Sequence, residues 1–322
     1  IGVISIIYTV SGGTRAVHVT HRHQMIVIFL SLFVIFFILL NHITSDYSFS
    51  ENLLIAKANN KLELIDFTFD INERYNVWSS MAALFLFLSY FGTDQSQVQR
   101  YITGKSIRES RLGLIMNGIM KVPLQLFILF LGVMVFLFYQ TNNAPLFFNQ
   151  QVHDKVEQSA DYGEQYSMLN DEYLEHLEDR NKLNNRLIEA RRSDDQAAVN
   201  NYSAEILSMA QKEQDLRAEA KSIIKAYDAD QEVNDKDYVF IGFILKHLPR
   251  GLVGLLLAVI FFAAMSSTSS ELNALAATTT VDIYKRNIVK DGSETHYLIA
   301  SKLWTLFWGL VAILFASVGT LF

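Results

Sequence analysis

The hydroxyl-rich run 263–273 carries the clearest chemical pattern in the chain. It reads Ala-Ala-Met-Ser-Ser-Thr-Ser-Ser-Glu-Leu-Asn. On a helix its small residues would form one narrow stripe, made of Ala263, Ser266, Ser267, Ser270 and Ala274. Serine hydroxyls and backbone carbonyls are hard, neutral oxygen ligands that suit a dehydrated alkali cation. The same stripe would also let two helices pack closely, with each hydroxyl bonded back to its own helix. The pattern alone leaves both interpretations open.

A lysine inside an apolar run is the second candidate for chemistry. Lys121 follows Arg111 by ten residues, which places it roughly 15 Å further along a helix. A lysine stem covers only part of that distance, so its ammonium would not reach water at the helix end. An intramembrane charge is costly and is a functional candidate by default. We expect Lys121 to contact substrate or form an ion pair, with a purely structural pairing as the alternative.

Aromatic residues gather in the apolar run 77–91, at Phe85, Phe87, Tyr90 and Phe91. This run has only about fifteen residues, which is short for a continuous membrane crossing. Short or broken helices mark the binding sites of many transporters. The aromatic side chains would then line a substrate path. Ordinary packing and interfacial aromatic residues are the alternative.

Long apolar helices must position these residues. Of the 322 residues, 51% are hydrophobic, and they are concentrated in runs at 1–10, 25–43, 77–91, 112–139, 251–281 and 297–322. A helix needs roughly 20 apolar residues to cross a bilayer, and several runs meet or approach that length. The sequence therefore predicts an all-α, polytopic membrane protein in contact with the lipid bilayer.

Charge placement predicts the orientation of the chain. Lys and Arg are concentrated in the short links 15–24, 100–111 and 285–294, which return to one side of the membrane. The loop 44–76 on the other side carries more Asp and Glu than Lys and Arg. The positive-inside rule makes the basic links cytoplasmic. We predict transmembrane spans at 1–140 and 238–322, and a hydrophilic insert outside the cell at 141–237.

The insert is predicted to form two helices that meet at Arg192-Ser-Asp-Asp195. Apolar residues recur at helical spacing on each side of that point, at Leu169, Tyr173 and Leu177, and at Val199, Tyr202, Ile206, Met209, Leu216, Ala220 and Ile223. This pattern is typical of a solvated antiparallel hairpin. A docking platform for a partner outside the cell is the sharper alternative.

Several other classes of protein and site are excluded by the same sequence. The chain has no Cys, which excludes disulfides and thiolate metal sites. No stretch resembles a nucleic-acid-binding surface, and no metal other than sodium is expected. The chain lacks an initial Met and begins and ends in apolar sequence. We interpret it as an internal piece of a longer protein.

Three motifs together resemble signatures of the sodium/solute symporter family. They are Tyr8-Thr-Val-Ser-Gly-Gly-Thr-Arg-Ala-Val17, Phe91-Gly-Thr-Asp-Gln-Ser-Gln-Val-Gln-Arg-Tyr-Ile-Thr-Gly-Lys-Ser106, and the run 263–273 with Asp282-Ile-Tyr-Lys285. They occur in the family's order and bracket nearly all of the chain outside the insert. The resemblance implies part of a LeuT-type inverted-repeat helix bundle. Residues 1–140 would hold the family's spans four to seven, and 238–322 its spans eight and nine.

The resemblance also implies where sodium would bind. The family's principal sodium site corresponds to the carbonyl of Ala263 and to Ser266 and Ser267, with its other half on the family's first span. A second sodium site, which only some members have, corresponds to Ser269 and Ser270. Those members also use an Asp from the span after the Gly-Gly motif. His21 stands at that place here, which weakens the case for a second site.

The substrate residues implied by the resemblance are the aromatic cluster and the lysine. Tyr90 and Phe91 match aromatic positions that gate the substrate from inside. Lys121 matches a lysine that contacts substrate in sugar-transporting relatives. Phe87 stands where those relatives place a polar side chain, which argues against a sugar.

These inferences predict a transporter rather than an enzyme. An inward sodium gradient would drive uptake of a small organic solute by alternating access, with Na⁺ as the coupling ion. The expected location is the plasma membrane, most simply a bacterial inner membrane. The alternative is a symporter-like sensor that detects a solute and signals through a partner or an attached domain.

Overall fold

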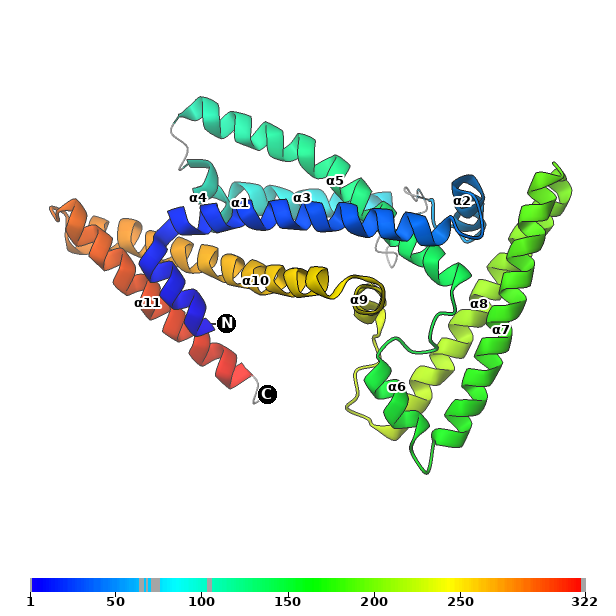
Figure 1. Cartoon of the computed structure of the whole chain (residues 1–322). Coiled ribbons are helices and arrows are strands. Elements are labelled where there is room, and N and C mark those ends of the chain that lie inside the picture. Colours follow the sequence, from blue (N-terminus) through cyan, green and yellow to red (C-terminus); the bar gives the residue numbers. More distant parts are fainter. Residues whose placement is uncertain (1, 64–66, 68, 71–75, 103–105, 320–322) are drawn as a thin grey trace. The chain divides into compact units, whose positions relative to one another are not determined.

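The computed structural model describes residues 2–63, 67, 69–70, 76–102 and 106–319, with the backbone alone for 13–20 and 100–102. Part of each of the first two signature motifs therefore lies outside the described side chains. The described chain is built from helices (Figure 1). Their bounds are α1 Gly2–Ile43, α2 Phe49–Ala58, α3 Val77–Gly92, α4 Gln95–Ile102, α5 Ile107–Thr141, α6 Gln150–Glu157, α7 Gly163–Arg192, α8 Gln196–Tyr227, α9 Lys236–His247, α10 Arg250–Thr278, the π-helix η1 Thr279–Ile288 and α11 Glu294–Gly319.

The apolar runs form the helices that the sequence predicts. Within the described residues, four stretches are long and apolar enough to cross a membrane: His21–Ile43, Ile107–Thr141, Arg250–Ile288 and Glu294–Gly319. Gly2–Gly12 and Val77–Gly92 are shorter apolar helices, so the run at 77–91 is as short as expected. Many large apolar side chains on these helices are exposed, as in the case of Phe85 and Phe315, each 74% exposed. Apolar surface on that scale needs a lipid or protein neighbour.

The predicted link at 15–24 is itself helical and overlaps the start of the apolar stretch His21–Ile43, with Gly2–Gly12 before it. Helix α1 runs without a break from Gly2 to Ile43. The segment holds no proline, and its Arg, His and Gln residues are compatible with a helix, so nothing in it stops the hydrogen-bond ladder. The polar character of this segment marks a change of environment along one helix.

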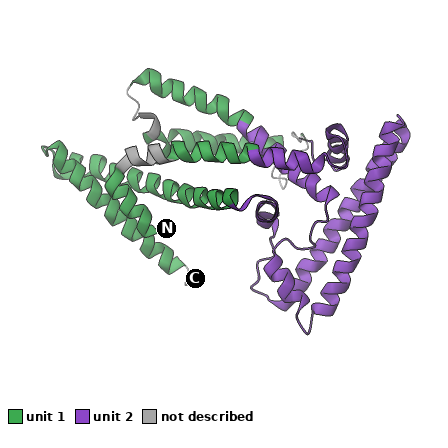
Figure 2. Cartoon of the chain, viewed as in Figure 1, with its two compact units in different colours: residues 1–33, 65–123, 251–322 green, residues 34–64, 124–250 purple. Residues whose placement is uncertain are grey.

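The chain divides into two compact units (Figure 2). Unit 1 comprises residues 1–33, 65–123 and 251–322, and unit 2 comprises residues 34–64 and 124–250. In unit 1 the first turns of α1 pack against α11. A Cβ on Gly309 would lie 2.5 Å from Ile6 Cγ1, so only glycine permits this approach. Trp308 Nε1 donates a hydrogen bond to Thr279 Oγ1 at 3.0 Å, which joins α11 to the start of η1.

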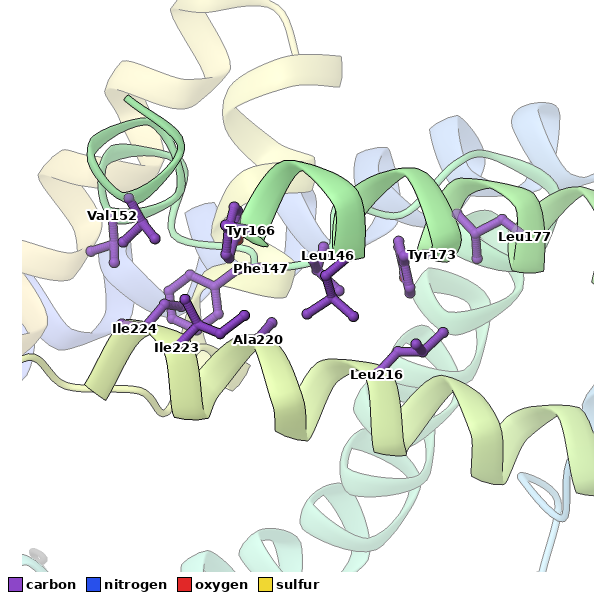
Figure 3. Packing of buried hydrophobic residues seen from close by; sticks show 12 residues of the cluster. Leu146, Phe147, Val152, Tyr166, Tyr173, Leu177, Leu216, Ala220, Ile223 and Ile224 are labelled. Carbon is purple, nitrogen blue, oxygen red and sulfur yellow. The ribbon is translucent and has the colours of Figure 1, made fainter. Parts of the chain in front are cut away.

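In unit 2, α7 and α8 form an antiparallel helical hairpin, and α6 packs against it. Buried apolar side chains fill the space between these helices (Figure 3). They include most of the residues that helical spacing had placed inward, among them Leu169, Tyr173, Leu177, Leu216, Ala220 and Ile223. The turn lies where it was predicted: Asp194 has φ 58, and the Asp195 side chain caps α8 by accepting from Ala198 N at 3.0 Å. The helical hairpin is confirmed.

A buried ion pair joins this hairpin to the end of α5. Arg180, whose side chain is 3% exposed, lies 2.9 Å from Glu213 through Nη1. Its Nη2 donates to the carbonyl oxygens of Tyr139 at 3.0 Å and Gln140 at 3.2 Å. These carbonyls belong to the last turn of α5, where no intrahelical donor is available. Arg180 therefore caps a membrane-length helix from within the hairpin.

A second arginine extends this network. Arg217 donates to Tyr173 Oη at 2.6 Å and lies 3.4 Å from Glu213. It also donates to the carbonyl oxygens of Pro145 and Leu146, at 3.0 and 3.1 Å. Burial alone would raise the pKa of the Glu213 carboxyl, but the two guanidiniums hold that pKa below its ordinary value. The carboxylate therefore stays charged and paired.

The far end of the hairpin contacts the segment after α1. Arg192 Nε lies 2.6 Å from Glu51 Oε1, and Tyr47 Oη donates to Asn185 Oδ1 at 2.7 Å. Glu51 also completes the capping box of α2 with Ser48. The Arg192 guanidinium and the Ser48 donors lower the pKa of Glu51 to about 2. The hairpin thus contacts other elements of unit 2, namely α6, the end of α5 and α2.

Candidate functional site

The hydroxyl-rich stripe of α10 turns two of its serines toward α1. Ser266 is 2% exposed and Ser269 is fully buried. Residues three apart share one face of a helix, so both serines lie on the face of α10 that packs against α1. Ser266 Oγ lies 2.8 Å from His21 Nδ1. Ser269 Oγ lies 2.8 Å from Thr9 Oγ1. Both partners are on α1, twelve residues apart, so the two helices meet through polar atoms at these two points.

The other predicted sodium residues have different surroundings. Ser267 is exposed, while Ala263 and Ser270 are half-buried. Ser270 Oγ donates to the Ser266 carbonyl at 3.1 Å. Helix α10 is continuous through this region, so the Ala263 carbonyl lies within a regular helix and not at a break. A carbonyl oxygen has two lone pairs, and one remains for a ligand even when the other accepts a helix hydrogen bond.

The hydrogen bond between Ser266 and His21 is compatible with cation binding. A serine hydroxyl has one proton to donate and two oxygen lone pairs. When Nδ1 of His21 is unprotonated, Ser266 donates to it and both lone pairs stay available to a cation. The imidazole then acts as a support that orients the ligand oxygen, which is a common role for groups behind a metal ligand.

Sequence reasoning missed Thr9, although it lies inside the first signature motif. Thr9 is 2% exposed, and its Oγ1 donates to the Ser5 carbonyl at 2.6 Å besides its bond to Ser269. The signal was present in the sequence as two small polar residues, Ser5 and Thr9, four apart on an apolar helix. Which helix they would face could not be read from that spacing.

The predicted substrate residues come together between α3 and α5. The Lys121 ammonium lies 5.3 Å from the ring centre of Phe91 and 5.8 Å from that of Phe87. The ring of Tyr90 meets that of Phe91 edge to face, with the centres 5.1 Å apart. Phe87 is 50% exposed and Tyr90 40% exposed, so this group has an open face. A cation within about 6 Å of aromatic faces is attracted by their negative potential.

The sodium:solute symporter family model matches residues 1–161 and 216–319. The chain belongs to the sodium:solute symporter family. That family is one of transporters and not of enzymes, and with the apolar helices described above it identifies an integral, multi-pass membrane protein. The unmatched residues 162–215 hold all of α7 and the first part of α8. The family model therefore matches the chain on both sides of the turn of the hairpin but not most of the hairpin itself.

Individual relatives match the chain over shorter stretches. It is 28% identical to the sodium/iodide cotransporter of Homo sapiens over 146 residues, which are 45% of this chain and 22% of that protein. It is 29% identical to the sodium-coupled monocarboxylate transporter 2 of Mus musculus over 119 residues, 36% of this chain and 18% of that protein. The sodium/sialic acid symporter of Aliivibrio fischeri is 35% identical over 71 residues, 22% of this chain and 14% of that protein.

A solved structure supports the fold assignment. It is a substrate-bound, outward-open state of a Na⁺-coupled sialic acid symporter, with a TM-score of 0.58 and 20% sequence identity. The likeness covers 100% of this chain and 50% of the other. The predicted fold class, a partial symporter helix bundle with a helical hairpin, is thereby confirmed. The chain spans half of that structure and about a fifth of the first curated relatives it matches.

Proposed function

We propose that the protein couples sodium entry to the uptake of a small solute by alternating access. Sodium would bind at α10 through the Ala263 carbonyl, Ser266 and Ser267. The observation that carries this proposal is the contact between buried Ser266 and half-buried His21, on a chain that belongs to a family of sodium symporters. Hydroxyl and carbonyl oxygens are the neutral, hard ligands that sodium needs.

A bound ion would act by bridging α10 to a second element of the transporter. The bound ion favours the conformation in which the ligands on α10 and those on the second element are close together. That conformation then binds the solute. Loss of the ion toward the sodium-poor cytoplasm removes this preference and favours release of the solute inside. Sodium shifts the equilibrium only by as much as it binds one state more tightly than the other.

We further propose that only the principal site is used. Ser269 and Ser270, the residues of the second site, are bonded to a hydroxyl and to a backbone carbonyl in this structure. His21, which stands in place of the carboxylate of two-sodium members, lies against Ser266 instead. The second site therefore lacks the carboxylate that two-sodium members use, and its two serine hydroxyls already have hydrogen-bond partners.

The proposed setting is a plasma membrane, most simply a bacterial inner membrane. The basic ends 100–111 and 285–294 would lie in the cytoplasm, and 141–237 outside. The hairpin would then meet solvent, or a partner, on the side from which the solute enters. The sensor alternative gains no support from family membership, since the match continues on both sides of the hairpin.

The function is tested by uptake into proteoliposomes that contain the purified full-length transporter. Labelled iodide, L-lactate, N-acetylneuraminate and glucose serve as solutes, chosen from the chemistry named for the relatives. We expect an inward sodium gradient to drive accumulation of at least one of them, with a Hill coefficient for sodium near one. An equal potassium gradient should drive none. Accumulation that is the same in both salts would refute sodium coupling.

A further inference from the structure

Two histidines from different helices lie side by side in unit 2. His42 is in the last turn of α1, and His247 is the last residue of α9; both belong to this unit (Figure 2). Their ring centres are 5.3 Å apart, and the ring planes are inclined at 76°. Both side chains line one pocket of about 540 Å³, together with Asn41 and apolar side chains of α1 such as Val34 and Phe37. The pocket therefore brings two imidazoles and an amide together on an otherwise apolar surface.

The separation of the two rings is the one that a shared metal ion requires. A tetrahedral zinc ion binds histidine nitrogen at about 2.0–2.1 Å, with its ligands about 109° apart. Because a ring nitrogen lies about 1.1 Å from the ring centre, two imidazoles on one such ion have centres about 5.2 Å apart. The distance between His42 and His247 agrees with this value. Rotation of the rings about their side-chain bonds would turn one nitrogen of each toward a common ion.

Aromatic side chains hold the two imidazoles in place. His247 stacks on Phe243 with the ring centres 5.2 Å apart. Phe138 meets both histidines edge to face, at 4.8 Å from His247 and 5.5 Å from His42. This packing reduces the entropy that the two side chains lose when they bind an ion. The pocket lies on another side of the same rings, where the Asn41 amide can bond to waters that complete the coordination.

We propose that His42 and His247 bind a divalent transition-metal ion, with zinc as the occupant, and that this ion ties the end of α1 to α9. Imidazole nitrogen is a good ligand for zinc, whereas magnesium and calcium prefer oxygen. His42 ends one membrane-length stretch and His247 shortly precedes another. Both adjoin segments that we predict to be outside the cell, so the ion would come from the external medium. The inference does not rest on the proposed function, because it uses other residues.

The test is calorimetric titration of zinc into the purified full-length transporter, without a polyhistidine tag and at neutral pH. We expect one zinc ion to bind per His42–His247 pair. Because the ion binds the folded state, it should also raise the melting temperature as its concentration increases. Magnesium and calcium at the same concentrations should leave that temperature unchanged.

Variants that keep the rings and remove the nitrogens separate metal binding from aromatic packing, since an edge-to-face ring pair is also a common packing contact. His42→Phe and His247→Phe should each raise the dissociation constant for zinc at least about tenfold, as does the loss of outer-shell partners in other metal sites. A melting temperature near that of the parent in metal-free buffer shows that a variant is folded. Where a phenylalanine variant does not fold, the glutamine variant at the same position replaces it.

A second group of possible ligands supplies the control. His153, Asp154 and Glu157 on α6 have ligand atoms within 4.8 Å of one another. His153→Gln should bind zinc like the parent. Loss of zinc affinity in this control, unchanged affinity in either variant of the His42–His247 pair, or no zinc binding by the parent would each overturn the proposal. Sodium-driven uptake in zinc-free buffer is measured separately, so the proposed function stands or fails independently of these results.

Discussion

Replacing Ser266 by alanine tests the sodium site most directly. Ser266 is 2% exposed, and its hydroxyl is within hydrogen-bond distance of His21 Nδ1. The substitution removes a single oxygen and leaves a smaller side chain, so it deletes a ligand without steric conflict. It also removes the bond that orients the site. Any change in sodium affinity is then attributable to that oxygen.

The expected magnitude follows from the type of interaction that is lost. A polar contact with a charged group contributes about 1.5–3 kcal/mol, and each 1.36 kcal/mol corresponds to a factor of ten. Ser266→Ala should therefore raise the sodium concentration for half-maximal uptake about 10- to 100-fold. The maximal rate at saturating sodium should change much less, because the residues proposed to contact the solute are on α3 and α5 and not on α10.

Two further variants on the same helix, one of a serine and one of a threonine, control for the loss of a hydroxyl. Ser269 is as deeply buried but is bonded to Thr9, and Thr268 Oγ1 donates to the Ala264 carbonyl of its own helix at 2.9 Å. Ser269→Ala and Thr268→Ala should each raise the sodium requirement less than about threefold, a shift below 0.7 kcal/mol. The measurement is initial uptake against external sodium in proteoliposomes.

The reasoning is refuted by two results. If Ser269→Ala impairs sodium dependence as much as Ser266→Ala, the one-site proposal fails. If Ser266→Ala leaves sodium dependence unchanged, while melting temperature confirms a folded protein, the stripe of α10 is a packing feature and the ion binds elsewhere.

Further expectations concern the hairpin, the replaced carboxylate and the orientation. Arg180→Met leaves buried Glu213 with only its weaker partner, so it should cost about 3–5 kcal/mol in unfolding free energy; a melting temperature equal to that of the parent would contradict the capping role. His21→Asp supplies the carboxylate that two-sodium members have at this position, so it should move the sodium Hill coefficient from near one toward two. A coefficient that stays near one would argue against the role given to His21. The chain has no Cys, so Asp194→Cys should react with an impermeant maleimide on intact cells and Ser106→Cys should not; the reverse pattern would invert the orientation.

Local sequence determined the helices and the class of protein. Apolar runs of membrane length fix where helices can cross a bilayer, because side chains that face lipid are mostly apolar and each backbone group must be bonded within the helix. Helical spacing in the insert placed Tyr173 and Leu216 in the hairpin core, and both are buried there. The link predicted at 15–24 is helical, because polar composition alone does not end a helix; α1 continues through it.

The tertiary structure decided which helix faces meet. Ser266 and His21 are 245 positions apart, and Thr9 and Ser269 are 260 apart. Their pairing depends on how α1 and α10 are rotated about their own axes, which neither segment encodes alone. The position of Lys121 over Phe87 and Phe91 likewise needs α3 and α5 side by side. The roles of these residues in binding sodium and solute stay predictions.

The Arg180 cap shows the same division in the hairpin. In the sequence, Arg180 is one more charged residue on the polar face of an amphipathic helix, and such residues are normally solvated. Only the fold brings it to the last carbonyls of α5 and to Glu213. The helical spacing of apolar residues is a local property, so it can be recognised in a short segment of the sequence. Partners distant in sequence are selected by the packing of whole helices, and that selection exists only once the helices are in contact.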